Sequence, residues 1–334
     1  MQRHGFDGNT DLYQAKTQEN KMLLLYSSVN NTGYFHLHTG KICIKELKSI
    51  NCKLSQNKNK PLFVYIHGEC LSSFSFKKEV DELKKDYTIL LPVLNEQSEN
   101  HSGFTTIQDA ATSIIEYIEQ NYEGHVQVLA GFSLGGQIVA EILAKRPDFS
   151  EYIMIESVMM RPKKIHSWSD FAAVHLNSLA KNKFFNSFMY YTKFNDDFAL
   201  EEYYKNYKVM SKETVRNELY ATYHYEMPSG LEKVQGKVAI LVGQREKKIV
   251  KESANLLHEA MPHAQIFVLQ NYTHGAFSLG HPQEYIRFVK SWIQEKDKQQ
   301  RIKERRKKEA EEGQYMPNWK HLLNKMKDKK AHQK

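Results

Sequence analysis

One serine of this chain lies where a nucleophile would be expected. An apolar run over 126–130 leads into Gly131, Ser133 and Gly135, which are spaced as G-x-S-x-G, and a run with helical spacing follows over 137–146. A sharp turn between a strand and a helix exposes its serine to a base and to a substrate. Glycines fit beside such a serine because a side chain there would collide with the neighbouring strand or helix. The pattern therefore predicts a nucleophilic serine at position 133.

Two more residues could complete the chemistry of a serine nucleophile. Glu246 follows an expected strand over 238–242, and His274 follows another over 265–269. Both side chains would lie with Ser133 at the carboxyl edge of a parallel sheet. A histidine can take the proton of the serine, and a carboxylate can orient the imidazole.

A second histidine, His281, lies seven residues after His274. Pro282 follows it directly and begins the last expected helix, over 282–293. Proline is favoured at the first position of a helix. We therefore assign His281 to the local structure of this helix start and His274 to the chemistry.

The elements that must position these residues alternate between strands and helices. Strands are expected over 62–66, 88–91, 126–130, 152–155, 238–242 and 265–269, and helices over 77–85, from 106 and after 133. Thr106 and Asp109 form an acidic variant of the capping box at the start of the second helix. The alternation predicts an α/β fold with a mostly parallel central sheet flanked by helices.

The chain divides into one core with three additions. We expect N-terminal strands over 1–60, a core over 61–157 and 233–294, a helical cap insertion over 158–232 and a basic, charged C-terminal tail over 295–334. The insertion interrupts the strand and helix alternation and is rich in aromatic residues, as a cap over a site would be. Its rings fit the cap's own core as well as they fit a substrate pocket.

Within the first sixty residues the expected elements are short. Runs over 22–27 and 34–38 flank a turn and predict a hairpin, and a strand over 41–47 and a polar linker follow.

Composition narrows the class of protein. The chain has 334 residues, of which 41% are hydrophobic, which is enough for a large core. Its three cysteines form no disulfide pattern and no CxxC metal site, which favours a reducing compartment. The longest apolar run near the start, over 22–26, is too short for a signal sequence or a membrane span. We expect a cytoplasmic protein.

The formal charge of +8 belongs almost entirely to the tail. Residues 295–334 hold 14 Lys or Arg against 7 Asp or Glu, so the rest of the chain is nearly neutral. Trp319, Leu322, Leu323 and Met326 follow helical spacing among lysines there. Such a helix could dock on the protein's own surface, on a partner protein or peripherally on an anionic membrane. The tail has no nucleic-acid recognition motif, so no specific nucleic acid is expected.

Three separated motifs give the chain a resemblance to a known family. They are His67-Gly68 after the strand 62–66, the Gly131 to Gly135 motif, and Thr273-His274-Gly275 after the strand 265–269. In this order they resemble the α/β-hydrolase fold, in particular its capped serine esterase and lipase-like members, over about 60–294. That family orders its triad as nucleophile, acid and histidine.

The resemblance implies a role for each matched residue. Ser133 would attack an acyl carbonyl, His274 would take and return the proton, and Glu246 would orient the imidazole. Glu156, after the strand 152–155, is a second position from which relatives supply the acid, and Glu246 is longer than the usual aspartate. Backbone N–H groups of Leu134 and Glu69 would form the oxyanion hole.

The sequence departs from the family at two places. Glu69 puts a carboxyl group at the oxyanion hole, where its charge would oppose catalysis, so we expect its side chain to point away or to meet a cation. Residues 92–97 replace a glycine-histidine-glycine turn that relatives often carry.

The leading interpretation is a serine hydrolase that cleaves carboxylic esters of small or medium apolar acyl groups, with no cofactor and no metal. A serine nucleophile does not fit the haloalkane dehalogenases or epoxide hydrolases, which attack with aspartate. A thioesterase or amidase would use the same triad. A non-catalytic binding or scaffold protein, with the tail as its interaction arm, is the alternative from another class.

Overall fold

In the computed structural model, the described residues are 60–94, 103–162, 182–193, 200–294 and 307, together with seven short strand segments. Four of these segments form an antiparallel sheet within the unit Met1–Lys48, in the order β1 (Gln2–Phe6), β2 (Thr10–Lys16), β3 (Met22–Ser28) and β4 (His38–Thr39). The pairing of β3 with β4 matches one end of the expected hairpin. The strand expected over 41–47 and the amphipathic segment at 319–326 lie outside the described residues.

A seven-stranded sheet forms the centre of the second unit, Ser49–Lys334. Its order is β13 (Gln265–Leu269), β12 (Lys237–Gly243), β11 (Ser150–Glu156), β10 (Val126–Phe132), β6 (Leu62–Ile66), β7 (Thr88–Val93) and β5 (Asn51–Leu54). The first six strands are parallel, and β5 pairs antiparallel with β7. The predicted mostly parallel sheet is confirmed, and the edge strand β5 adds a strand that was not among the expected ones.

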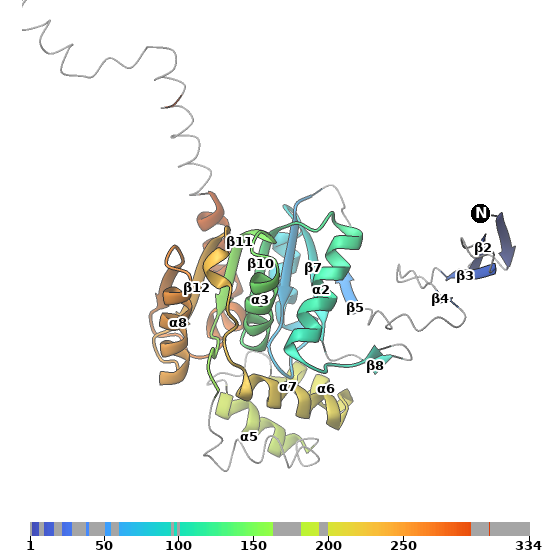
Figure 1. Cartoon of the computed structure of the whole chain (residues 1–334). Helices are drawn as coiled ribbons and strands as arrows, with labels where there is room; N and C mark the ends of the chain where they lie inside the picture. Colours follow the sequence, from blue (N-terminus) through green and yellow to red (C-terminus); the bar gives the residue numbers. More distant parts are fainter. Residues whose placement is uncertain are drawn as a thin grey trace, which may run out of the picture. The chain divides into compact units, whose positions relative to one another are not determined.

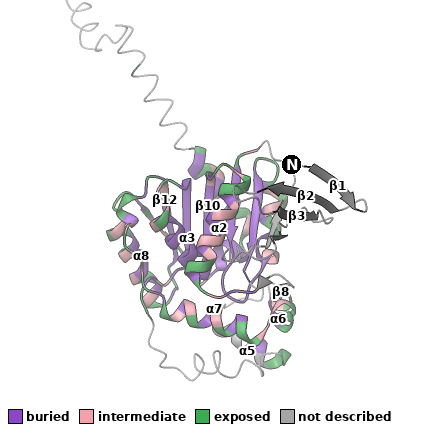
Figure 2. Cartoon of the chain, turned by 45° about the vertical axis from the view of Figure 1, so that its right-hand side comes forward, coloured by how far each residue is buried: buried purple, intermediate pink, exposed green. Residues whose placement is uncertain are grey.

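Helices cover both faces of this sheet (Figure 1). One face carries α2 (Ile107–Asn121), α3 (Leu134–Lys145) and α8 (Lys248–Ala260), and the other carries α1 (Lys77–Leu83) and a helix over 282–294. The strands are buried between these layers (Figure 2). Thr106 accepts a hydrogen bond from the backbone N–H of Asp109 at 3.0 Å, as predicted for the start of α2. The buried apolar faces of the helices therefore form two hydrophobic cores, one on each face of the sheet. The first core lies under α2, α3 and α8, and the second lies under α1 and the helix over 282–294.

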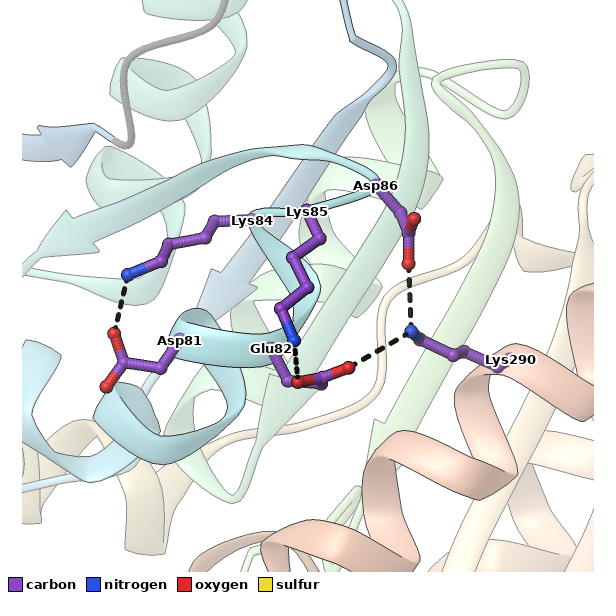
Figure 3. Close-up of polar contacts among 6 residues, drawn as sticks. All are labelled: Asp81, Glu82, Lys84, Lys85, Asp86 and Lys290. Carbon is purple, nitrogen blue, oxygen red and sulfur yellow. Dashed lines mark hydrogen bonds and ion pairs between the residues drawn. The ribbon is translucent and has the colours of Figure 1, made fainter.

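Exposed ion pairs join α1 to the helix over 282–294 (Figure 3). Lys290 lies 2.9 Å from Asp86 and 3.7 Å from Glu82, and Lys85 pairs with Glu82 at 2.6 Å. Pairs that are this exposed to water contribute little to stability. The buried contacts of Leu83 with the second core, not these charges, fix α1 on the sheet.

Three helices lie together beyond one end of the sheet (Figure 1). They are α5 (Lys183–Lys193), α6 (Leu200–Val209) and α7 (Lys212–His224), and they fall in the predicted cap range. Tyr190, Tyr203 and Tyr207 are buried, with ring centroids 5.3 and 6.0 Å apart along this series. These rings therefore pack among themselves. The side chains of Phe185, Phe188, Phe194 and Phe198 lie outside the described residues.

No helix in the described part of the chain is long and apolar enough to cross a bilayer.

Candidate active site

Ser133 occupies a strained turn between β10 and α3. Its φ of 53° and ψ of −115° lie in a region that residues with a side chain seldom adopt. The turn is held because Ser133 N donates to Glu156 O at 2.9 Å. A Cβ atom on Gly131 would collide with the backbone of Gly135, and one on Gly135 would collide with the carbonyl of Ile66. Both glycines are therefore needed for the helix to approach the strands this closely.

His274 and Glu246 form a pair at the ends of two neighbouring strands. Nδ1 of His274 lies 3.1 Å from Oε2 of Glu246, and the Glu246 side chain is almost fully buried. The two loops are tied together because Arg245 N donates to Tyr272 O at 3.0 Å. The imidazole also packs against Phe132, with ring centroids 5.0 Å apart. Phe132, the residue before Ser133, therefore contacts His274.

The surroundings of Glu246 favour its charged form. Burial alone would raise the pKa of Glu246, but the charge of His274 and the hydrogen bond to it, together with the Ser157 side chain, lower the pKa below its usual value. A carboxylate facing Nδ1 favours the tautomer with its proton on Nδ1. Nε2 of His274 is then the nitrogen that can accept a proton.

The Glu69 side chain faces Ser133. Oγ of Ser133 donates a hydrogen bond to Oε2 of Glu69 at 2.9 Å, and both residues are buried. The expectation that Glu69 points away from the site is therefore wrong. Its side chain direction depends on the packing of a loop against distant helices, which local sequence does not encode.

That loop, 67–71, is anchored from several sides. Nδ1 of His67 lies 2.9 Å from Gly68 O, and Nε2 of His67 accepts from Leu94 N at 3.3 Å. Burial lowers the pKa of His67 to about 4, although the Gly68 carbonyl acts in the opposite direction. His67 is consequently neutral near pH 7, and it joins the loop to the end of β7.

Helices α6 and α7 hold the same loop. Cys70 N donates to Oε2 of Glu218 on α7 at 2.7 Å. The Asn206 side chain on α6 donates to the carbonyls of Cys70 and Leu71 at 3.0 and 3.3 Å. Sequence reasoning missed both anchors, because a polar residue on an amphipathic helix carries no signal of such a distant partner.

The predicted backbone donors follow two neighbouring strands, β10 and β6. Leu134 is the first residue of α3, so its N–H has no acceptor within the helix and lies at the positive end of the helix dipole. Glu69 follows Gly68 at the end of β6. Beside Leu134 an anion would be stabilised, whereas an ionised Glu69 carboxyl group would oppose it.

The two alternative residues have other contacts. Oε1 of Glu156 accepts from Ser278 N at 3.2 Å, while His274 faces Glu246. Nδ1 of His281 lies 2.8 Å from Ala276 O, and its carbonyl accepts from Glu284 N and Tyr285 N at the start of the last helix. The described residues contain no group of three or more His, Cys, Asp or Glu that could hold a metal ion.

Known proteins share this architecture. No protein-family model matches the sequence. An esterase from Thermogutta terrifontis superposes with a TM-score of 0.61 at 15% identity, covering 74% of this chain and 93% of its own. An enol-lactonase from Burkholderia xenovorans superposes with a TM-score of 0.62 at 12% identity, covering 73% of this chain and 96% of its own.

A shorter match exists in sequence. The uncharacterized hydrolase YugF of Bacillus subtilis is 31% identical over 108 residues, which are 30% of this chain and 38% of that relative. The match thus spans well under half of the relative's length. Together with the sheet order and the turn at Ser133, the structural likeness identifies the fold. The chain has the fold of the α/β-hydrolase superfamily.

Proposed function

We propose that this protein is a serine hydrolase that cleaves carboxylic esters of small or medium apolar acyl groups. The observation that carries the proposal is the His274–Glu246 pair after the neighbouring strands β13 and β12, together with a strained Ser133 after β10 of the same parallel sheet, whose preceding residue Phe132 packs against His274. The names of the similar proteins, an esterase and an enol-lactonase among them, favour the same class of reaction.

The chemistry assigns one role to each residue of this triad. Oγ of Ser133 attacks the ester carbonyl while Nε2 of His274 takes the serine proton. The charge on the carbonyl oxygen is stabilised by backbone N–H groups, that of Leu134 first. Nε2 then returns the proton to the leaving alcohol, and an acyl-serine remains. Water attacks this ester by the same route and releases the acid, while Glu246 stabilises the imidazolium in both halves.

For the triad acid, the contacts favour Glu246 over Glu156. Glu246 faces Nδ1 of His274 and has a lowered pKa, as a carboxylate that stabilises a cation requires. Glu156 is engaged with Ser278 N instead. A thioesterase or an amidase would use the same three residues, so panels of esters, thioesters and amides separate these substrates.

One observation favours a second candidate, a non-catalytic binding protein. The hydrogen bond from Ser133 to Glu69 places a carboxyl group directly beside the proposed nucleophilic oxygen, where an ionised carboxylate would oppose the charge that develops in the reaction. For turnover Glu69 must turn aside or be neutralised when the substrate binds. A binding protein would need no such change.

Labelling by a fluorophosphonate probe tests the proposal without knowledge of the substrate. We expect the wild-type protein to be labelled and the Ser133→Ala variant to be unlabelled while its circular dichroism is unchanged. Ser291→Ala, which changes an exposed serine on the helix over 282–294, is the control and should retain labelling. A folded wild-type protein that resists the probe would favour the binding protein.

A further inference from the structure

A cluster of buried polar side chains lies behind the loop that carries His274. Its members come from five different elements and are all at most 3% exposed. They are Tyr65 on β6, Glu79 on α1, Glu156 at the end of β11, Ser278 in the π-helical turn η4 (Ala276–Gly280) and Tyr285 in the helix over 282–294. The proposed reaction uses none of these side chains.

Glu156 contacts both halves of the proposed site. Its backbone carbonyl accepts from Ser133 N at 2.9 Å, and its side chain accepts from Ser278 N at 3.2 Å. The turn that contains Ser278 begins directly after His274 and Gly275, and Leu279 N donates to Gly275 O at 3.0 Å. One residue therefore fixes the backbone on which the nucleophile is presented and the backbone that follows the histidine.

The cluster offers little to stabilise a negative charge. Among the described residues, Oε2 of Glu156 and Oε1 of Glu79 are buried carboxyl oxygens without a hydrogen-bond partner. An ionised carboxylate in such a place loses its hydration without replacement. A neutral carboxyl group loses much less.

The pKa shifts in the cluster agree with its burial. Burial raises the pKa of Glu156 to about 7, and the charge of Glu246 adds to the rise, while contacts with Ser278 and the charge of His274 act against it. Burial likewise raises the pKa of Glu79 to about 8, with a further rise from Glu156 and opposing effects of its own backbone N–H and of Lys78. Burial raises the pKa values of Tyr65 and Tyr285 well above the usual value, so both hydroxyls stay neutral.

On the basis of the proposed function, we propose that Glu156 is a positioning residue that acts in its uncharged form. It holds the backbone after His274 through Ser278 N, and its neutrality leaves Glu246 as the charged partner of the imidazole. Loss of its proton places a second buried negative charge beside Glu246. Rising pH then weakens the arrangement of His274, although no proton of Glu156 takes part in the reaction.

Two substitutions distinguish the effect of the uncharged state of Glu156 from the effect of its contact with Ser278 N. Glu156→Gln keeps an oxygen that accepts from Ser278 N and removes the titration, whereas Glu156→Leu removes both. The matched control is Glu79→Gln, which removes the other buried carboxyl group of the cluster but not the contact with Ser278. For each protein, kcat and KM are measured with a neutral ester between pH 6 and pH 9.

We expect the ratio of kcat in Glu156→Gln to kcat in the wild type to rise about tenfold across this range, because the variant cannot acquire the second charge. Glu156→Leu should lose kcat by on the order of 100-fold with little change in KM, since a small misplacement of a reacting group is costly. Glu79→Gln should keep a fall of kcat with rising pH, with its midpoint at the same or a slightly lower pH, because Glu79 and Glu156 repel each other when both are charged. A ratio that does not change with pH overturns the proposal, and so does a Leu variant with wild-type kcat.

A readout without turnover distinguishes this proposal from the proposed function. Infrared spectroscopy detects the C=O stretch of a protonated carboxyl group. At pH 6 we expect signals from both Glu156 and Glu79, of which the Glu156 signal weakens above pH 7, is missing in Glu156→Gln and is retained in Glu79→Gln. A protein with the Glu156 signal but no hydrolysis would overturn the esterase and keep a neutral Glu156. Absence of the Glu156 signal in an active enzyme would overturn the positioning role alone.

Discussion

Two buried carboxyl groups, Glu246 and Glu69, lie at opposite corners of the site and face different partners. Glu246, after β12, faces Nδ1 of His274, while Glu69, after β6, faces Oγ of Ser133. In a triad reaction the imidazole becomes positive and the carbonyl bound to the serine becomes negative. A negative charge therefore helps at one corner and hinders at the other. The sign of the charge that develops beside a carboxyl group decides its effect, and burial at both corners magnifies that effect.

Neutralising Glu246 should have the largest effect on kcat/KM. We expect Glu246→Gln to lower kcat/KM by about 10³- to 10⁴-fold, because the amide neither stabilises the imidazolium nor holds the tautomer with its proton on Nδ1. Initial rates on a neutral ester and the rate of fluorophosphonate labelling measure this loss.

Glu259→Gln, an exposed change on α8, is the control and should keep wild-type rates. If Glu246→Gln remained near wild type while Glu156→Gln lost activity at every pH, the acid role would pass to Glu156. The contrast between the two corners would then be lost.

His67, which lies in the same loop as Glu69, extends the comparison to stability. His67 in the Ser133 corner is buried, and burial lowers its pKa to about 4, so the folded state resists its protonation. Between about pH 6.5 and pH 4 the unfolded chain binds this proton more readily, and folding stability falls as pH falls. The loss reaches about 3 kcal/mol at pH 4.

Urea unfolding of the wild type and of His67→Gln at pH 7 and pH 4.5 measures this loss of stability. The difference in the free energy of unfolding between the two proteins should shrink by about 2 kcal/mol at the lower pH. Carboxyl groups such as Glu246 titrate in both proteins and cancel in this difference. A difference that is the same at both pH values would show that His67 is protonated equally in the folded and unfolded states.

Much of the scaffold could be predicted from the sequence. The six parallel strands are short apolar runs bounded by turn residues, and each lies within two residues of its expected range. Ser133 and Glu246 follow such runs directly and His274 follows soon after, so the strand ends set their common location. The edge strand β5 escaped prediction because the alternation of Asn51, Cys52, Lys53 and Leu54 is brief and lies in a polar stretch.

Side chain directions could not be predicted in the same way. Glu69 faces Ser133 in a loop whose next residue is held by Glu218, 148 positions along the chain. Glu156 ends a strand, as a triad acid would, yet its side chain accepts from Ser278 N. Both outcomes depend on long-range packing, which residue types and spacing do not specify.

Neutralising Glu69 should have the smallest effect on kcat/KM, and this effect should be an increase. Two unit charges about 4 Å apart repel by about 4 kcal/mol at an effective dielectric constant of 20, and Glu69 can relieve part of this by turning aside. We therefore expect Glu69→Gln to raise kcat/KM by about tenfold, which corresponds to about 1.4 kcal/mol of barrier. The rate of fluorophosphonate labelling should rise with it.

A second variant separates charge from hydrogen bonding at this corner. Glu69→Leu keeps a side chain of similar length but removes both the charge and the acceptor of the Ser133 hydrogen bond. If repulsion dominates, both variants gain rate, because the backbone N–H of residue 69 remains in each. If both instead lost tenfold or more, the Glu69 carboxylate would be assisting Ser133, and the two corners would act in the same sense.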